Sequence, residues 1–430
     1  MNTCHVPVNQ VYWYQKPSET VHLERDETVD LVVVGGGFAG LHAAQAAARR
    51  GLKVALLEKD FCGSGASGKS SGFITPDAEF SFGDLVDMHG PERALALWDF
   101  ISSGVEIIRA NIHEYAIDCQ FQKKDSLMLA SSASKFNTQI VKEYEARTRY
   151  RLEATLYDTQ RVKQIVGSTR YYGGISYNAT FSIKAFDYCQ GLKKVLCDQG
   201  VAIYEESPVT ALCTDGVSTA RAYVRAKNVV VATDYALPDL APFAAYDVYH
   251  VQTFLMVSAQ LPEEQARALF PAQDMMAWDT DFIYHYFRLT QDNRLLLGGG
   301  TIFSTYARSA HYHNRLMFYM LDRYAKRYFP DCSFEWDSMW PGLIGITKDI
   351  FSFAGKDNGN PHRYYVSGAT GLPWATALGN YAIDSLLDGR KEFDDIFSPY
   401  RRFFIPHALQ TLIGTRAAFA LSNFKQVGSL

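Results

Sequence analysis

The clearest pattern of apolar and polar residues lies near the N-terminal end of the chain, over residues 30–58 (DLVVVGGGFAGLHAAQAAARRGLKVALLE). Its first apolar run, residues 31–34, is continuous, as in a strand that is buried on both faces of a parallel sheet. The alanine-rich stretch that follows favours a helix, and Gly51 stands where a C-terminal cap is expected. A second apolar run, residues 54–57, completes the pattern of a βαβ unit.

Farther along the chain the pattern changes to that of an antiparallel sheet. Residues 249–258, 281–289 and 295–300 are rich in residues that favour strands. Residues 291–294 (QDNR) separate the last two of these stretches and are typical of a hairpin turn. A parallel unit followed by antiparallel strands predicts a mixed α/β chain, and its length of 430 residues predicts two or three domains.

Glycines occupy the turn between the first strand and the helix of the βαβ unit, in the motif GGGFAG of residues 35–40. In this G-x-G-x-x-G pattern Gly35 makes the tight turn, Gly37 lets a pyrophosphate approach the backbone, and Gly40 lets the helix pack close to the strand. The helix start also offers free N–H groups to phosphates. The motif, with a strand before it and a helix after it, predicts a dinucleotide site.

Glu58 ends the second strand of the unit, where its carboxylate accepts hydrogen bonds from ribose hydroxyls and disfavours a 2′-phosphate. The ligand is therefore FAD or NAD rather than NADP. Residues 61–73 (FCGSGASGKSSGF) follow, and their glycines and serines are typical either of a flexible surface linker or of a polar loop beside a ligand. Their position directly after Glu58 favours a loop that passes the ribityl chain and flavin ring of FAD.

The segments GGGFAG, LLEKD and GSGASGKSSG resemble the D-amino-acid oxidase and glycine oxidase superfamily of FAD-dependent oxidoreductases, and within it the gamma-glutamylputrescine oxidase-like branch. The resemblance continues over most of the chain, in residues 12–14, 204–211, 229–234, 284–289, 295–300, 340–349 and 365–389. It implies the following FAD-binding residues: Gly35, Gly37, Phe38, Ala39, Gly40, Glu58, Lys59, Gly65, Ala66, Ser67, Ser70, Ser71, Gly72, Val209, Ala232, Thr233, Gly345, Gly371, Leu372, Pro373 and Trp374.

The same resemblance implies a discontinuous Rossmann-type FAD-binding domain with an inserted substrate domain on an antiparallel sheet. We expect the FAD-binding domain in residues 28–105, 195–240 and 340–390, and the substrate domain in residues 106–194 and 241–339. Residues 1–27 form an N-terminal arm and residues 391–430 a C-terminal extension that packs on the body.

The segment Gly371-Leu372-Pro373-Trp374 departs from the resemblance, because the family usually has a second glycine pair there. A proline is compatible with the start of a helix, since its missing N–H is one that the helix does not use. We expect a helix over residues 374–387, with its N-terminus facing the flavin pyrimidine edge. Trp374 adds bulk near the expected substrate pocket. Residues 343–349 lack cysteine and residues 64–73 lack histidine, so we expect the flavin to be bound without a covalent link.

Candidate substrate-pocket residues come from the resemblance and from a tyrosine-rich strand. Tyr284, Tyr286 and Arg288 alternate, so we expect their side chains on one face. Arg288 is a candidate partner for a substrate carboxylate, or else a structural arginine at a sheet edge. Trp340 and Trp374 are candidate walls of the flavin site, and core packing is the alternative for each.

Composition narrows the class of protein. A net charge of -4 disfavours nucleic acid as a partner, and 14% aromatic residues permit an apolar ligand pocket. The 7 cysteines form no disulfide or zinc pattern, which is typical of a reducing compartment. The start shows no signal-peptide pattern and no stretch is long and apolar enough to span a membrane, so we expect a cytoplasmic protein. His311 and His313 lack a third ligand, and we expect no metal.

Three functional hypotheses follow. The leading one is an FAD-dependent oxidase or dehydrogenase that oxidises the C–N bond of a small amine or amino acid, with O2 or another acceptor reoxidising the flavin. The branch resemblance favours a gamma-glutamylputrescine-like or other N-substituted amine. The alternatives are a flavin monooxygenase or hydroxylase, and a non-catalytic redox partner that carries flavin.

Overall fold

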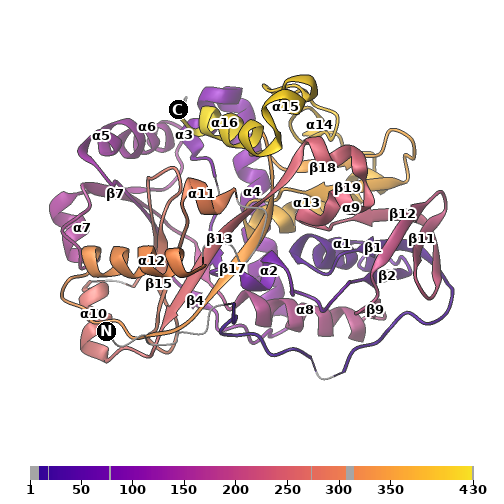
Figure 1. The fold of residues 1–430 in the computed structure, drawn as a ribbon, viewed down its shortest axis with the longest axis horizontal. Helices are drawn as coiled ribbons and strands as arrows, with labels where there is room; N and C mark the ends of the chain where they lie inside the picture. The colour runs from indigo at the N-terminus through magenta and orange to yellow at the C-terminus, as the bar shows by residue number, and fades with distance from the viewer. Residues whose placement is uncertain (1–8, 18, 77–78, 273, 307–313, 429–430) are drawn as a thin grey trace.

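The computed structural model describes residues 9–428 with the exception of 18, 77–78, 273 and 307–313. Two large sheets, each with 8 strands, form the two halves of the molecule. The long strands β13 (Val248–Ser258) and β17 (Trp336–Thr347) cross the middle between them (Figure 1).

The first sheet contains the βαβ unit. Strand β1 (Glu27–Val34) lies between β2 (Val54–Leu57) and β12 (Tyr223–Val231), and both pairings are parallel. All four residues of β2 are buried, as expected for a strand covered on both faces. The remaining strands of this sheet are β9 (Ala202–Tyr204), β10 (Val209–Cys213), β11 (Gly216–Thr219), β18 (Phe353–Lys356) and β19 (Arg363–Ser367).

Four helices build the largest core, on one face of the first sheet. Helix α1 (Phe38–Ala48) packs on α13 (Leu372–Leu387), and α13 in turn packs on α4 (Pro91–Glu114). Helix α8 (Ala185–Asp198) also contacts α1. In α1 the side chains of Leu41, Ala43, Ala44 and Ala47 are fully buried, so packing explains the apolar pattern of the alanine-rich stretch.

The second sheet is mostly antiparallel, and the hairpin expected at residues 291–294 joins two of its strands. Asn293 adopts a φ of 58° in that turn, a conformation that asparagine tolerates. In order the strands are β17, β13, β16 (Leu295–Gly299), β15 (Tyr286–Leu289), β14 (Met276–Asp279), β5 (Ser126–Leu129), β7 (Gly173–Tyr177) and β6 (Thr155–Asp158). Helix α12 (Asn314–Tyr328) covers this sheet (Figure 1).

Shorter elements join the two halves. A small sheet contains β3 (Phe73–Ile74), β8 (Phe181–Ser182) and β4 (Gln122–Lys123). The remaining α-helices are α2 (Ala66–Lys69), α3 (Phe82–His89), α5 (Ala133–Lys135), α6 (Lys142–Arg149), α7 (Thr159–Ile165), α9 (Leu237–Leu240), α10 (Glu263–Leu269), α11 (Ile302–Thr305), α14 (Asp394–Phe397), α15 (His407–Ile413) and α16 (Thr415–Gly428).

The expected fold class, a Rossmann-type parallel sheet with a separate antiparallel sheet, is confirmed. The expected boundaries need adjustment where pairing decides them. Residues 340–347 were expected in the FAD-binding domain, but they belong to β17 and pair with β13 in the second sheet. Helix α4 extends past the expected boundary at residue 105, and α8 begins before residue 195. Residues 281–289 were expected to be rich in strand, but β15 begins only at Tyr286, so Tyr284 lies before the strand on which its alternation with Tyr286 and Arg288 was expected.

The C-terminal segment folds back over the junction of the two halves, as Figure 1 shows for α14, α15 and α16. In α16 the Asn423 side chain donates to the carbonyls of Thr347 and Lys348 at 2.8 and 3.0 Å, and so binds the end of β17. Among the described residues, no helix combines the length and apolar character that crossing a membrane requires.

Candidate active site in a cavity between the two sheets

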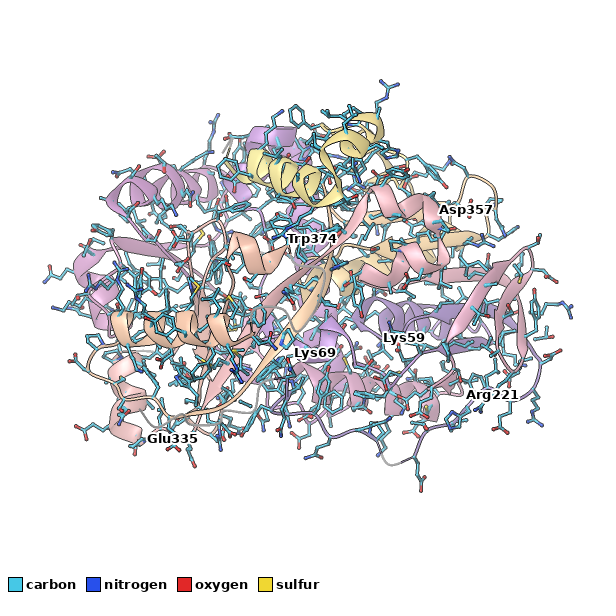
Figure 2. All side chains as sticks on the ribbon, viewed as in Figure 1. Lys59, Lys69, Arg221, Glu335, Asp357 and Trp374 are labelled. Atoms are coloured by element: carbon cyan, nitrogen blue, oxygen red, sulfur yellow. The ribbon has the colours of Figure 1, made fainter. Side chains whose placement is uncertain are left out.

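A cavity of about 680 Å³ extends from the N-terminus of α1 to the tyrosines of the second sheet. Lys59 and Lys69 line it and lie in the central part of the molecule, far from Arg221 and Glu335 near its edges (Figure 2). Most of the FAD-binding residues implied by the sequence line this one cavity. They are Gly35, Gly37, Phe38, Ala39, Glu58, Lys59, Gly65, Ala66, Ser67, Ser70, Ser71, Val209, Ala232, Thr233, Gly371, Leu372 and Pro373.

The backbone of the glycine motif forms one end of the cavity. Gly35 has a φ of 106°, and a Cβ there would lie 2.4 Å from the carbonyl oxygen of Ala232. Gly37 is the N-cap of α1, and no side chain caps the helix from that position. Just inside the helix, the Oγ of Ser67 accepts from the Phe38 N–H at 2.9 Å. Main-chain N–H groups with positive dipole character therefore face the cavity, as a diphosphate requires.

Glu58 follows β2 at the same end of the cavity. Its two carboxylate oxygens accept from the N–H groups of Gly36 at 2.7 Å and Asp60 at 3.0 Å. Burial raises the pKa of Glu58, and these two N–H groups act in the opposite direction. The hydrogen bonds hold the carboxylate at the edge of the cavity, where each oxygen keeps a second lone pair for a ribose hydroxyl.

The N-terminus of α13 also lines the cavity. Its N-cap is Gly371, with a φ of 116°, no side chain caps it, and proline stands in its first turn. Nearby, the buried Oγ1 of Thr233 has no partner among the described residues. Two helix N-termini whose N-cap residues are glycines, and a polar atom without a partner among the described residues, therefore line one cavity. These residues fit FAD, which presents a diphosphate to one terminus and an electron-poor ring system elsewhere.

The glycine- and serine-rich loop is held in place, so its interpretation as a flexible linker is wrong. It contains α2, and aromatic side chains from distant segments donate to its carbonyls. The Nε1 of Trp13 donates to Gly68 at 2.6 Å, and the hydroxyl of Tyr14 contacts the carbonyl of Gly63 at 2.9 Å. The Nε1 of Trp340 donates to Lys69 at 3.0 Å. The aromatic N-terminal arm thus positions the loop from outside the cavity.

Arg288 does not lie in the cavity, which corrects the expectation that it meets a substrate carboxylate. Its guanidinium is buried and donates to the carbonyls of Ser71 at 2.8 Å, Ile183 at 3.1 Å and Leu289 at 3.1 Å. Tyr286 shares strand β15 with it, but the length of the arginine carries its charged end away from the tyrosine and onto the loop. Arg288 is therefore a structural residue that ties the second sheet to the glycine- and serine-rich loop of residues 61–73.

Four of the implied FAD-binding residues do not line the cavity. Trp374 is only 4% exposed and packs edge-on against Phe100 and Phe397, so core packing is the correct alternative for it. The other three are glycines that permit close packing. A Cβ on Gly40 would lie 1.9 Å from the carbonyl oxygen of Gly35, and one on Gly72 would lie 1.9 Å from that of Ile183. A Cβ on Gly345 would lie 2.7 Å from Asp234 Oδ1.

The other end of the cavity is an aromatic chamber, which we define by Tyr284, Tyr286, Phe73, Trp278 and Tyr306. The rings of Tyr284 and Tyr286 lie 5.8 Å apart, and Phe73 meets Tyr286 edge-on at 6.0 Å. Burial raises the pKa of Tyr286 to about 12 and that of Tyr284 well above its usual value, so both hydroxyls keep their protons. Trp340 has both of the roles considered for it, since it lines the cavity and is also 1% exposed, packed edge-on against Trp13 with ring centroids 5.1 Å apart.

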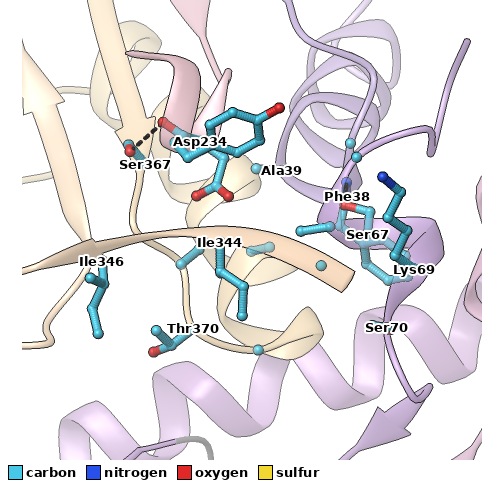
Figure 3. Close-up of a pocket in the computed structure, with 18 of the residues that line it drawn as sticks. Phe38, Ala39, Ser67, Lys69, Ser70, Asp234, Ile344, Ile346, Ser367 and Thr370 are labelled. Atoms are coloured by element: carbon cyan, nitrogen blue, oxygen red, sulfur yellow. Dashed lines mark hydrogen bonds between the residues drawn. The ribbon is translucent and has the colours of Figure 1, made fainter. Parts of the chain in front are cut away.

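Asp234 is a cavity residue whose role sequence reasoning missed. Its carboxylate accepts from the N–H groups of Gly345 at 2.9 Å and Gly368 at 3.2 Å, and its carbonyl accepts from the Ser367 hydroxyl at 2.8 Å (Figure 3). It thereby joins the end of β12 to β17 and β19, so that Ile344 faces into the cavity. Its φ of 49° was not detectable as a pattern.

Three potential metal ligands, Asp279, Asp281 and His285, are neighbours in sequence of the chamber residues Trp278 and Tyr284. Single ligand atoms of Asp279, Asp281 and His285 lie within 4.8 Å of one another. Lys135 Nζ already lies 2.5 Å from Asp281 Oδ1, and the hydroxyl of Tyr324 donates to Asp279 at 3.1 Å, so ordinary partners satisfy the carboxylates. His311 and His313 lie outside the described residues.

Comparison with known proteins agrees with this geometry. Residues 30–384 match the family described as "DAO: FAD dependent oxidoreductase". The chain is 30% identical over 391 residues to gamma-glutamylputrescine oxidoreductase of Escherichia coli (strain K12), covering 89% of each chain. It is 29% identical over 388 residues to probable oxidoreductase OrdL of Haemophilus influenzae, covering 87% of this chain and 86% of that protein.

Solved structures show the same fold. Glycine oxidase from Geobacillus kaustophilus superposes with a TM-score of 0.72 at 20% identity, covering 88% of this chain and 100% of that one. We call the turn of residues 35–40, with the start of α1, the glycine cradle. The cradle, the loop beside it and the inserted antiparallel sheet have the arrangement of a known fold, and this chain belongs to the DAO family of FAD-dependent oxidoreductases.

Proposed function

We propose that the protein oxidises the C–N bond of a small amine to an imine. The observation that carries the proposal is the continuity of one cavity, which joins the glycine cradle to the aromatic chamber. FAD, when bound, supplies the hydride acceptor for this oxidation. The amine loses a hydride from carbon and a proton from nitrogen as the C=N bond forms, and water then hydrolyses the imine.

The residues of the chamber act on the amine through its surroundings. Phenyl, phenol and indole rings replace water around the reacting nitrogen, and desolvation lowers the pKa of an ammonium group. The neutral amine has a free lone pair that assists the departure of the hydride. Tyr284 and Tyr286 keep their protons, so they act as hydrogen-bond donors and not as bases.

We further propose that the substrate is an N-substituted or polyamine-derived amine and that FAD is bound without a covalent link. The first point rests on the relative named gamma-glutamylputrescine oxidoreductase. The second is supported by Cys62, which is fully buried, does not line the cavity, and has its pKa raised by burial. The electron acceptor is O2 or another oxidant. A flavin monooxygenase and a non-catalytic redox partner are not favoured by the relatives.

An anaerobic amine screen tests the proposal. The protein is purified with its flavin, mixed with candidate amines in the absence of oxygen, and followed by the visible band of oxidised flavin. We expect bleaching by at least one amine and none by NADPH alone. Bleaching by NADPH would instead indicate a monooxygenase, and inertness to every amine would indicate a redox partner. Acid precipitation tests the bond to flavin, since a non-covalent flavin stays in the supernatant.

A further inference from the structure

The aromatic chamber contains an acid for which the proposed oxidation has no use. Glu79 lines the cavity, and the hydroxyl of Tyr284 donates to its Oε1 at 3.2 Å. The neighbouring residue Phe80 stacks on Phe351 with ring centroids 4.6 Å apart, which anchors the backbone beside Glu79. Burial raises the pKa of Glu79, and the Tyr284 hydroxyl lowers it. The carboxylate is thus held at a defined place in a desolvated chamber.

No cation of the described residues pairs with Glu79. Among the described residues, Tyr284 is the only side chain that affects the pKa of Glu79, and it lowers that pKa while burial raises it more strongly. In the part of the chain that the structure describes, two basic residues line the cavity, Lys59 and Lys69. The Nζ of Lys59 lies 5.4 Å from the ring centroid of Tyr235, and Lys69 belongs to the glycine- and serine-rich loop. Arg288 is committed to main-chain carbonyls. Glu79 is half-buried, and a carboxylate that is partly withdrawn from water without a cation costs free energy unless a ligand supplies the charge.

The rest of the chamber offers acceptors and ring faces to such a ligand. Gln252 is fully buried and lines the cavity, and its Oε1 has no partner among the described residues although its Nε2 donates to Ser304 at 2.8 Å. The Oγ1 atoms of Thr75 and Thr305 also lack partners there. Glu79 raises the pKa of both Tyr286 and Tyr306, so its charge reaches these two rings as well. A carboxylate, free acceptors and aromatic faces together are complementary to an ammonium ion.

We propose that this part of the chamber is a subsite for a second ammonium group of the substrate, one that is not oxidised, and that Glu79 pairs with it. The substrate class is therefore a diamine or a polyamine derivative, and not an α-amino acid. The carboxylate of an α-amino acid would meet Glu79 without a guanidinium to balance it. This inference rests on the proposed amine oxidation, and it deepens that proposal by assigning a residue to substrate choice.

The test compares α,ω-diaminoalkanes with monoalkylamines of equal length in the anaerobic bleaching assay. We expect the wild-type protein to prefer a diamine by at least about tenfold in kcat/KM, and the Glu79→Gln variant to lose that preference. Glu335→Gln, at a distant edge of the molecule, is the matched control and keeps it. Equal rates for diamines and monoamines, or an unchanged preference in Glu79→Gln, would overturn the inference and leave the amine oxidation standing.

Binding provides a readout that does not depend on turnover. Bisquaternary α,ω-diammonium salts lack the lone pair that oxidation needs, and calorimetry measures their affinity for the flavin-loaded protein. We expect affinity that falls at least about tenfold in Glu79→Gln and not in the control. Glutamate-dependent binding without bleaching by any amine would support the subsite and refute the proposed oxidation. Equal binding to both variants would refute the subsite.

A second variant keeps the inference falsifiable if Glu79→Gln fails to retain flavin. Glu79→Asp preserves the charge on a side chain that is shorter by one methylene. We expect the preferred diamine to become longer, because its free ammonium has farther to reach. An unchanged optimum would contradict the pairing of Glu79 with that group.

Discussion

The two ends of the cavity are built from different materials. The dinucleotide end is formed largely by backbone, with Gly35 in the turn and Gly37 and Gly371 as the N-cap residues of α1 and α13. The aromatic chamber is formed by side chains, which come from β3, β14, β15, the segment before β15 and the residue after α11. At the dinucleotide end an added Cβ would disturb cofactor binding, whereas in the chamber the chemical identity of each side chain decides which substrate binds.

This difference separates cofactor retention from substrate choice. Main-chain N–H groups recognise a diphosphate in any related protein, so the first end is the same for many substrates. Tyr284, Trp340 and Glu79 can change while the cradle stays intact, so the second end distinguishes one substrate from another. Variants in the two regions should therefore fail in different ways.

The largest effect is expected for Gly35→Ala. The new Cβ would lie 2.4 Å from the carbonyl oxygen of Ala232, and the φ of 106° is strained for alanine. We expect a loss of roughly 3 kcal/mol or more in the free energy of unfolding, together with loss of bound flavin. Flavin content and urea unfolding measure both effects.

Gly51→Ala is the matched control for that variant. Gly51 has a φ of 77°, but nothing lies within 4 Å of an added Cβ. It should cost only roughly 1–2 kcal/mol, from backbone strain, and should retain flavin. Equal flavin loss in both variants would show that strain, and not close approach, explains the glycine at position 35.

The next largest effect is expected for Arg288→Met, a change on the strand that carries Tyr286 of the chamber. Removal of the guanidinium leaves the buried carbonyls of Ser71 and Ile183 without donors, so we expect a loss of about 3 kcal/mol in stability. Urea unfolding measures it, with the exposed Arg267→Met as control. Unchanged stability combined with a raised KM for amines would restore the substrate role that we expected from the sequence.

An effect of intermediate size is expected on the pH dependence of stability, and it arises from His42 in α1. His42 in α1 is fully buried, and burial lowers its pKa from 6.5 to about 4. The unfolded chain therefore takes up a proton near 6.5 that the folded protein refuses until the pH approaches 4. The stability contributed by this residue is complete above 6.5 and is lost as the pH falls.

From about pH 7 to pH 5 the loss assigned to His42 is about 2 kcal/mol. We expect the wild type to lose this much more than His42→Gln over that interval, as measured by urea unfolding at several pH values. Parallel curves for the two proteins would show that His42 is protonated in the folded state.

The smallest effect is expected for Trp374→Phe. This side chain packs between Phe100 and Phe397 outside the cavity, so the variant should lose about 1 kcal/mol in stability and keep the flavin spectrum. Trp340→Phe should instead shift the visible band and change amine bleaching, since Trp340 lines the cavity. A spectral shift in Trp374→Phe alone would reverse the assignment of the two tryptophans.

The sequence by itself determined the fold class, the glycine cradle and the place of Glu58. These features are local: a buried strand, a turn that needs glycine and a helix start follow one another within about thirty residues, and their periodicity and turn chemistry are readable without any distant partner. The hairpin between β15 and β16 was predictable for the same reason.

Only the tertiary structure decided which polar and aromatic side chains meet at the cavity. Arg288 and Tyr286 alternate on one strand, yet the arginine is captured by the carbonyls of Ser71 and Ile183, which lie far away in the sequence. Glu79 reaches Tyr284 across 205 positions, and Trp13 reaches Gly68 across 55. A long side chain selects its partner from whatever donors and acceptors packing brings within reach, and a strand pattern specifies the face but not that partner.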